Sequence, residues 1–194
     1  MIPPSRVTRR TKETEVELEL TLDGRGQAAI STGIPFLDHM LALFAAHGYF
    51  DLKINAKGDL EVDQHHTVED IGLCLGQAFR QALEGLGGYK RYGQARLPMD
   101  EALAVVAVDL SNRPFLHFQV KFPPGGAALD PQMVKEFWRA VAQKGGMTLH
   151  IEVPYGDNAH HIMEAIFKAA ARALDMATQD EPRAPGVPST KGVL

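Results

Sequence analysis

Residues 36–56, FLDHMLALFAAHGYFDLKINA, and residues 133–153, MVKEFWRAVAQKGGMTLHIEV, share one order of apolar and polar positions at a shift of 97 residues. Apolar residues coincide at five pairs of positions: Met40/Phe137, Leu41/Trp138, Phe44/Val141, Leu52/Leu149 and Ile54/Ile151. A segment that recurs with its apolar pattern preserved indicates an internal structural repeat. We therefore expect two similar units, each about half of the 194 residues.

The repeat extends on both sides of this segment. Upstream, TKETEVELELTLDGR matches LPMDEALAVVAVDLSNR at a shift of 88, which places Glu13 over Glu101 and Arg25 over Arg113. Downstream, a pair of adjacent histidines in each half matches at a shift of 95, because the second connection is two residues shorter. The expected boundaries are internal repeats at about 7–87 and 91–178 of a single domain, 1–194, with a tail at about 180–194.

Local patterns predict the same elements in both halves. Val16, Leu18, Leu20 and Leu22 alternate with polar residues, as in a half-buried strand. In the first helix, Pro35 suits the first turn and Gly48 the C-terminal end. Half one is expected to form strands near 15–22, 27–32 and 49–56 and helices at 34–48 and 65–86. Half two is expected to form strands near 92–97, 102–110, 115–121 and 147–153 and helices at 131–144 and 160–177.

These elements predict an α+β fold, a tandem repeat of two similar units that each contain one sheet and two helices. We expect the sheets to be antiparallel and to pack around the helices. The sequence does not give the order of the layers.

Composition and charge argue against several classes of protein. The formal net charge of −4 provides no basic field for a general nucleic-acid-binding protein. The start, MIPPSRVTRRTKETEVE, has no apolar signal core, and no run approaches the ~18 apolar residues of a membrane span. The one cysteine, Cys74, lies in the apolar run IGLCLGQAF and is expected in the core. We expect a cytoplasmic protein without nucleic-acid or membrane partners.

Each half carries two histidines followed by a glutamate, QHHTVED at 64–70 and AHHIMEA at 159–165. Adjacent residues of a helix diverge by about 100°, so the two rings of one pair cannot reach one point. The glutamate lies within reach of either ring. Imidazole and carboxylate suit transition metals such as Mn, Fe, Co, Ni or Zn. The alternative, exposed polar residues near a helix N-terminus, is disfavoured because the motif occurs twice.

The repeat adds one candidate ligand to each motif. His39 precedes its histidine pair by 26 residues, and Glu136 precedes the other pair by 24. Two metal ions with open positions for substrate or water are expected. The eight candidate ligands are His39, His65, His66, Glu69, Glu136, His160, His161 and Glu164. His150 is a reserve ligand, and His117 is expected to be structural.

Several segments resemble the imidazoleglycerol-phosphate dehydratase family of histidine biosynthesis: STGIPFLDHML, QHHTVEDIG, GYKRYG, PMDEALA, DLSNRP, MTLHI, NAHHIMEAIFKAAARAL and PSTKGVL. They follow one another over nearly the whole chain. The resemblance implies the monofunctional form, a ribosomal protein S5 domain 2-like fold and two Mn²⁺ ions per active site. It also implies active sites at the subunit interfaces of a 24-subunit cage built from trimers. Many family members have histidine where this chain has Glu136, so a carboxylate would replace an imidazole at the metal.

The resemblance implies the dehydration of D-erythro-imidazoleglycerol phosphate to imidazole-acetol phosphate. The hydrogen to be removed is barely acidic, because its carbon adjoins no carbonyl group. Two metal ions could bind both ring nitrogens once the ring proton is lost, and this imidazolate could expel the neighbouring hydroxyl. A diazafulvene-like intermediate would form, and loss of the next C–H would give an enol that becomes the ketone.

The resemblance also suggests a role for individual residues. Glu13 in RRTKETEV is expected to be the general acid or base, and Glu69 and Glu164 to assist proton transfer. Phosphate contacts are expected from Arg91, Arg113, Ser189 and Lys191, whose guanidinium, hydroxyl and ammonium groups suit phosphate oxygens. Further substrate contacts are expected from Glu13, His39, His47 and His65. The Pro- and Gly-rich tail is expected to become ordered over the substrate, and Asp100 and Glu101 have no assigned role.

Two other functions remain open at this point. A dinuclear metallohydrolase acting on a small phosphorylated substrate would release inorganic phosphate or an acid. A non-enzymatic assembly held together by metal would give the basic residues no purpose.

Overall fold

The computed structural model describes residues 3–86, 88–125, 127–183 and 189. Half one forms β1 (Ser5–Arg10), β2 (Thr14–Thr21), β3 (Ala28–Ser31), α1 (Pro35–Gly48), β4 (Asp51–Gly58) and α2 (His65–Glu84). Half two forms β5 (Tyr92–Met99), β6 (Ala102–Asp109), β7 (Phe115–Gln119), α3 (Pro131–Gly145), β8 (Thr148–Tyr155) and α4 (Ala159–Thr178). The predicted elements are all present; β1 was not predicted.

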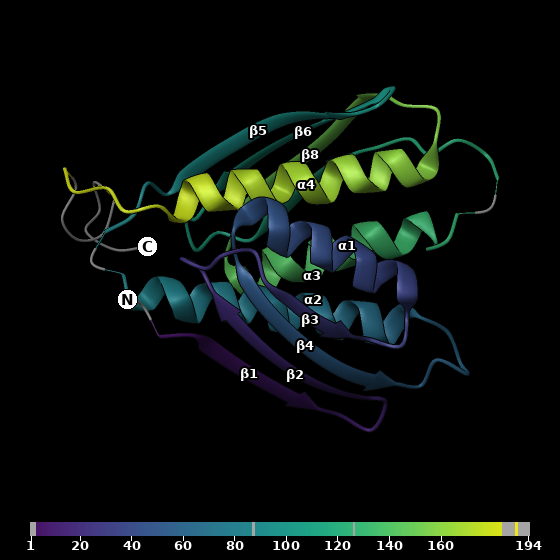
Figure 1. Ribbon diagram of the computed structural model, residues 1–194, viewed down its shortest axis with the longest axis horizontal. Coiled ribbons are helices and arrows are strands. Elements are labelled where there is room, and N and C mark those ends of the chain that lie inside the picture. The colour runs from purple at the N-terminus through teal and green to yellow at the C-terminus, as the bar shows by residue number, and fades with distance from the viewer. Residues whose placement is uncertain (1–2, 87, 126, 184–188, 190–194) are drawn as a thin grey trace.

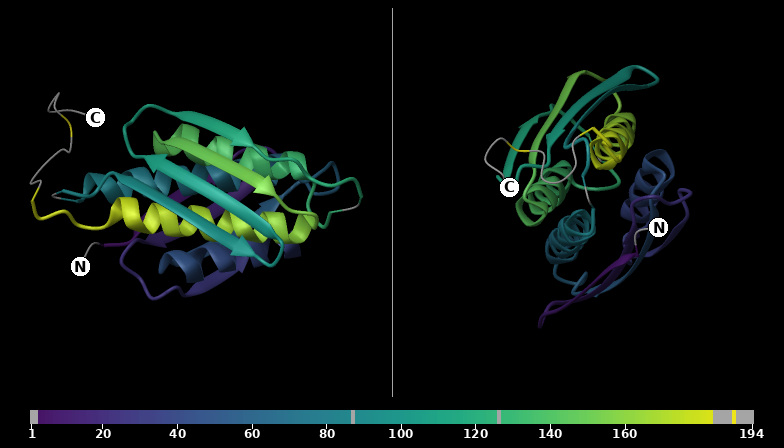
Figure 2. Two further views of the ribbon diagram at one scale, coloured as in Figure 1. Left: turned by 90° about the horizontal axis from the view of Figure 1, so that it is seen from above. Right: turned by 90° about the vertical axis from the view of Figure 1, so that its left-hand side faces the viewer.

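Two sheets enclose the four helices (Figure 1). Sheet 1 has the strand order β1-β2-β4-β3, and sheet 2 has the same order in the repeat, β5-β6-β8-β7. Helices α1 and α2 contact sheet 1, and α3 and α4 contact sheet 2, as the end view in Figure 2 shows. The prediction of two similar units with sheets packed around helices is confirmed.

The expectation of wholly antiparallel sheets is wrong for one pair of strands in each half. β3 runs parallel to β4, and β7 runs parallel to β8. In both halves a helix connects the two strands, and such a crossover returns the chain to its original direction. The helices predicted between these strands already implied the parallel pairing.

The apolar repeat in the sequence is the core of the structure. The ten residues matched at the shift of 97 are all buried: Met40, Leu41, Phe44, Leu52, Ile54, Phe137, Trp138, Val141, Leu149 and Ile151. Strand β2 buries Val16, Leu18 and Leu20 on one face, as the alternation predicts. Gly48 does not end α1 by a left-handed conformation, because Tyr49 takes that role with φ 56°. Cys74 is buried, and burial raises the pKa of its thiol to about 12.

Helices α2 and α3 approach closely at two glycines of α2. An added Cβ at Gly72 would stand 2.7 Å from the Phe137 carbonyl oxygen, and one at Gly76 would stand 2.4 Å from that of Val141. No side chain fits at such distances without moving a helix backbone. These two glycines allow α2 to pack closely against α3, so one helix from each half meets the other.

We expect Gly76→Ala to lower the free energy of unfolding by about 1–3 kcal/mol through overpacking. An alanine in a helix normally stabilises it by up to about 1 kcal/mol, so destabilisation would report the lost helix contact. Gln77→Ala, at an exposed position of the same helix, is the matched control and should change stability by less than about 0.5 kcal/mol. Denaturant unfolding of both variants tests this, and equal stabilities would contradict the packing argument.

Candidate metal and acid–base site

Three of the ligands predicted from the sequence lie together in a group that we call cluster one: His39, His160 and Glu164. The Nε2 atoms of His39 and His160 each lie 3.0 Å from Glu164 Oε1. Their ligating atoms all fall within 4.8 Å of one another. Both histidine side chains are about half exposed, whereas that of Glu164 is 9% exposed. Cluster one thus offers two imidazoles and one carboxylate from a solvent-accessible surface.

Lys168 was not predicted and lies against cluster one. Its Nζ donates to Glu164 Oε2 at 2.5 Å and contacts Met99 Sδ at 3.3 Å. Burial alone would raise the pKa of Glu164, but hydrogen bonds from Lys168, His39 and His160 outweigh burial and lower this pKa to about 2. Glu164 is therefore an anion, as a metal ligand must be. The spacing of four residues between Glu164 and Lys168 was the available signal.

The corresponding group, cluster two, consists of His65, Glu69 and Glu136 and is looser. His65 Nε2 lies 3.9 Å from Glu69 Oε2. Arg139 joins the two carboxylates, since it pairs with Glu136 and lies 3.5 Å from Glu69 Oε1. Glu136 thus contacts Arg139 rather than a histidine, and its role as a metal ligand stays a prediction.

Each cluster combines the two halves of the chain. Cluster one joins His39 of α1 to the motif of α4, and cluster two joins Glu136 of α3 to the motif of α2. The helix contacts agree, because α1 packs against α4 and α2 packs against α3. The ligand that precedes each motif in the sequence therefore belongs in space to the other motif.

The second histidine of each motif points away from its cluster, as the divergence along a helix requires. His66 Nδ1 lies 3.0 Å from Asp59 Oδ2 and 3.9 Å from Glu13 Oε2. His161 Nδ1 lies 2.7 Å from Glu101 Oε2. A carboxylate only accepts hydrogen bonds, so Nδ1 carries the proton and the neutral ring keeps its lone pair on Nε2. In this tautomer, Nε2 of both second histidines can accept a metal, and their role as ligands stays a prediction.

Glu13 lies in the turn between β1 and β2, which is fixed from several sides. Thr11 Oγ1 accepts from the backbone N–H of Glu13 at 3.1 Å and of Thr14 at 2.9 Å. Thr14 donates in turn to buried Asp70 on α2, whose other oxygen accepts from Arg9 at 2.7 Å. The Glu13 side chain remains 55% exposed. A held backbone with an accessible carboxylate suits a group that transfers protons.

The predicted phosphate-binding arginines meet at Asp109. Arg91 binds this carboxylate through Nε at 2.7 Å, and Arg113 Nη2 lies 3.3 Å from it. Arg91 is buried with φ 71°, whereas the Arg113 side chain is 66% exposed. Ser189 is among the described residues, and Lys191 lies outside them.

Arg91 is far from cluster one within one chain. The Arg91 N–H donates to the Ala177 carbonyl near the C-terminus of α4, whereas His160 lies at its N-terminus. The intervening 17 residues of helix correspond to about 25 Å. A small substrate cannot span this distance, so one chain does not unite all predicted site residues.

The three remaining histidines lie in two places. His47 lies on α1, and burial together with the cations of Lys168 and Arg172 lowers its pKa. His117 and His150 lie opposite each other on β7 and β8, with ring centroids 5.1 Å apart. Their strand positions match outward-facing residues of sheet 2, so His150 is not joined to cluster one.

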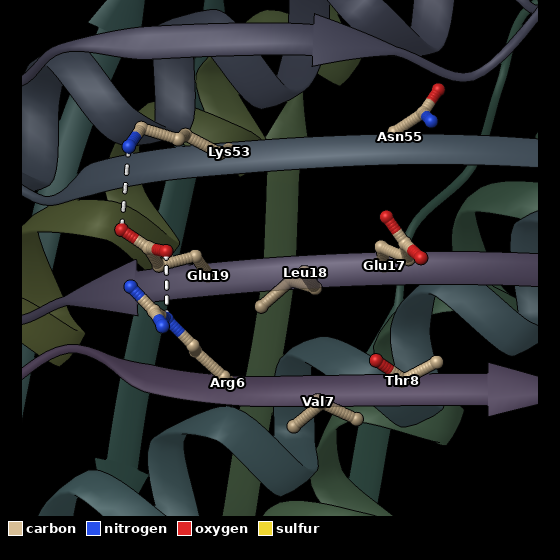
Figure 3. Close-up of a pocket in the computed structure, with 8 residues that line it drawn as sticks. All are labelled: Arg6, Val7, Thr8, Glu17, Leu18, Glu19, Lys53 and Asn55. Carbon is tan, nitrogen blue, oxygen red and sulfur yellow. Dashed lines mark hydrogen bonds and ion pairs between the residues drawn. The ribbon is translucent and has the colours of Figure 1, made fainter.

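Two hollows in the surface differ in whether they adjoin a predicted site residue. Figure 3 shows one of about 380 Å³ on the outer face of sheet 1, where Glu19 pairs with Arg6 and Lys53. Both cations of this hollow are therefore already paired with the Glu19 carboxylate. Another, of about 420 Å³, lies beside His160 and is lined by the β7–α3 connection. That connection is longer than its counterpart in half one and borders cluster one.

The donor chemistry of cluster one fits a divalent transition metal. When a metal displaces the protons on the Nε2 atoms that face Glu164, two imidazole nitrogens and an anionic carboxylate converge on one region, which is the mixture that Mn, Fe, Co and Zn accept. Three donors do not complete the coordination of Mn²⁺, which prefers octahedral geometry, so further ligands are required.

In the described part of the chain no helix is long and apolar enough to cross a membrane.

Comparisons with known proteins agree on one family. The sequence profile of "Imidazoleglycerol-phosphate dehydratase" matches residues 32–174. An imidazoleglycerol-phosphate dehydratase from Bacillus subtilis is 56% identical over 187 residues, 96% of each chain. Another from a Geobacillus species is 54% identical over the full length of both. The enzyme structure from Staphylococcus aureus superposes with a TM-score of 0.83 at 37% identity, covering 92% of this chain and 99% of that one. The structure of IGPD from Pyrococcus furiosus gives 0.86 at 40% identity, with coverage of 97% and 100%.

Proposed function

Since the chain belongs to the imidazoleglycerol-phosphate dehydratase family and is a hydro-lyase of histidine biosynthesis, we propose that it dehydrates imidazoleglycerol phosphate with two Mn²⁺ ions. The observation that carries the metal proposal is the convergence of His39, His160 and Glu164 within 4.8 Å. Its pseudo-equivalent, cluster two, would hold the second ion. The second histidines, His66 and His161, would supply Nε2 to complete the two sites.

Bound Mn²⁺ would stabilise the substrate's imidazole ring without its ring proton, which makes the neighbouring hydroxyl a better leaving group. The chain's own residues would do the rest. Glu13 would move a proton at the hydroxyl or the adjacent C–H, with Glu69 and Glu164 assisting. Arg113, Arg91, Ser189 and Lys191 would hold the phosphate, and His47 would contact the substrate.

We propose that the complete site forms between subunits, as in the 24-subunit cage that the resemblance implies. Two observations support this arrangement. Arg91 lies about 25 Å from His160 within one chain, so phosphate and imidazole of one substrate need residues of different copies. Each cluster also requires additional ligands. The rings of His66 and His161 point away from the clusters of their own chain, so they could serve a neighbouring copy. A cytoplasmic location stays a prediction.

The identity of the product tests the reaction. After incubation with imidazoleglycerol phosphate, phosphorus NMR should show a new phosphate ester, and carbon NMR should show the ketone of imidazole-acetol phosphate. The metallohydrolase alternative would instead release inorganic phosphate. A protein that only assembles around metal would leave the substrate unchanged, so the three functions give three different spectra.

A further inference from the structure

The two halves provide the second histidine with a carboxylate partner in different ways. In half two the partner is Glu101, the repeat equivalent of Glu13. In half one the partner is Asp59, and Glu13 remains at 3.9 Å. Two equivalent glutamates at the same turn thus have different surroundings.

Both carboxylate oxygens of Glu101 accept hydrogen bonds. Its Oε2 binds His161, and its Oε1 accepts from the backbone N–H groups of Asp157 at 3.2 Å and Asn158 at 2.9 Å. Three donors thus hold both oxygens of Glu101 in place, whereas the Glu13 carboxylate has no hydrogen bond among the described residues.

Glu13 has the opposite surroundings. Its backbone is held, because its N–H donates to Thr11 and its carbonyl accepts from the Asp59 N–H at 3.1 Å. Its carboxylate has one close neighbour among the described residues, the His66 ring. The segment between Asp59 and His65 is two residues longer than that between Gly156 and His160. Among the described residues, no backbone N–H donates to the Glu13 carboxylate as those of Asp157 and Asn158 donate to Glu101.

The partner of the second histidine differs between the halves because the residue at the Asp59 position differs. Since β4 and β8 match at a shift of 97, the equivalent of Asp59 is Gly156. A Cβ at Gly156 would lie 2.8 Å from the Ile162 side chain and 2.9 Å from Ala102. No carboxylate fits there, so in half two the orienting role falls to Glu101.

We infer that Asp59 is a positioning residue that occupies Nδ1 of His66 and thereby leaves the Glu13 carboxylate available to the substrate, whereas Glu101 has only the orienting role at His161. This inference rests on the proposed function, because it takes Glu13 as the proton-transfer group and His66 and His161 as metal ligands. A hydrogen-bonded carboxylate fixes the ring and tautomer of a ligating histidine. The contact between Asp59 and His66 can then explain why, of Glu13 and Glu101, only Glu13 works as an acid or base.

The test is a cycle of Asp59→Ala and Glu13→Ala, read by Mn²⁺ affinity and by kcat and KM. In Asp59→Ala, Glu13 should take the vacated Nδ1, so Mn²⁺ affinity stays within a few-fold while kcat falls by about 10-fold or more with little change in KM. Asp59→Asn, which keeps an acceptor, should recover most of kcat. Glu101→Ala, the matched control in half two, should weaken Mn²⁺ binding by about 10–100-fold and recover activity when Mn²⁺ is saturating.

The double variant separates this inference from the proposed function. Glu13→Ala alone should leave Mn²⁺ affinity unchanged, but added to Asp59→Ala it should weaken binding by about 10–100-fold, measured by the EPR signal of free Mn²⁺. Additive effects on Mn²⁺ affinity, or full kcat in Asp59→Ala at saturating Mn²⁺, would overturn the inference. If Glu13→Ala alone kept full turnover, the proton-transfer role would fail, whereas the Mn²⁺ cycle would still report the exchange at His66.

Discussion

Glu13→Gln should lower kcat by about 10²–10⁴-fold, the usual contribution of a positioned acid or base. The amide has nearly the size of the carboxylate but cannot accept a proton from the substrate. The Glu13 side chain is 55% exposed, so its replacement leaves no buried group unsatisfied. Its backbone contacts to Thr11 and Asp59 do not depend on the side chain. Steady-state kinetics of the Mn²⁺-loaded protein measures the effect.

Metal content and subunit assembly are the controls for this variant. Both should match the wild type, because Glu13 is not a proposed metal ligand. A Glu13→Gln protein that lost its metal would contradict the assignment, since the residue would then act through the metal site. The matched variant Glu17→Gln alters an exposed glutamate of β2 and should turn over normally.

His160→Ala and His65→Ala should each weaken Mn²⁺ binding by at least about 100-fold, more than the loss of an orienting partner. Each variant removes the first imidazole of one motif. In His160→Ala, Glu164 still contacts His39 and Lys168, so the subunit should remain folded. If the sites lie between subunits, both variants should also reduce the proportion of full-size assembly.

Native mass spectrometry and metal analysis measure these two effects together. His150→Ala is the matched control, because His150 lies beside His117 on sheet 2 rather than in cluster one. It should keep its metal and its assembly. A fully loaded His65→Ala or His160→Ala protein would refute the ligand role of that residue.

Local periodicity predicted the elements well because the information is local. The alternation around Val16 and the helical spacing from Val68 to Phe79 both appear as buried faces. The β1 strand was missed because its short SRVTRR sequence has little apolar alternation. The pairing of α1 with α4 could not be predicted, since the two halves carry the same apolar pattern and either pairing would bury it.

The ligand motifs were predicted from their duplication, whereas their neighbours were not. Asp59 lies in a segment with Glu61 and Asp63, and nothing in the sequence selects one of three acidic residues in an irregular loop. Lys168 could have been suggested by its spacing from Glu164. Glu101 stood out only as the repeat equivalent of Glu13, and its contact with His161 depends on the fold.

The most direct test of metal-dependent dehydration uses chelator-stripped protein before and after Mn²⁺ is added, with imidazoleglycerol phosphate as substrate. The stripped protein should form no ketone, and added Mn²⁺ should restore its formation along with the assembled form. If the assembled, Mn²⁺-loaded protein formed no imidazole-acetol phosphate, or if the stripped protein turned over as fast as the loaded one, the proposed role of the two clusters would be wrong.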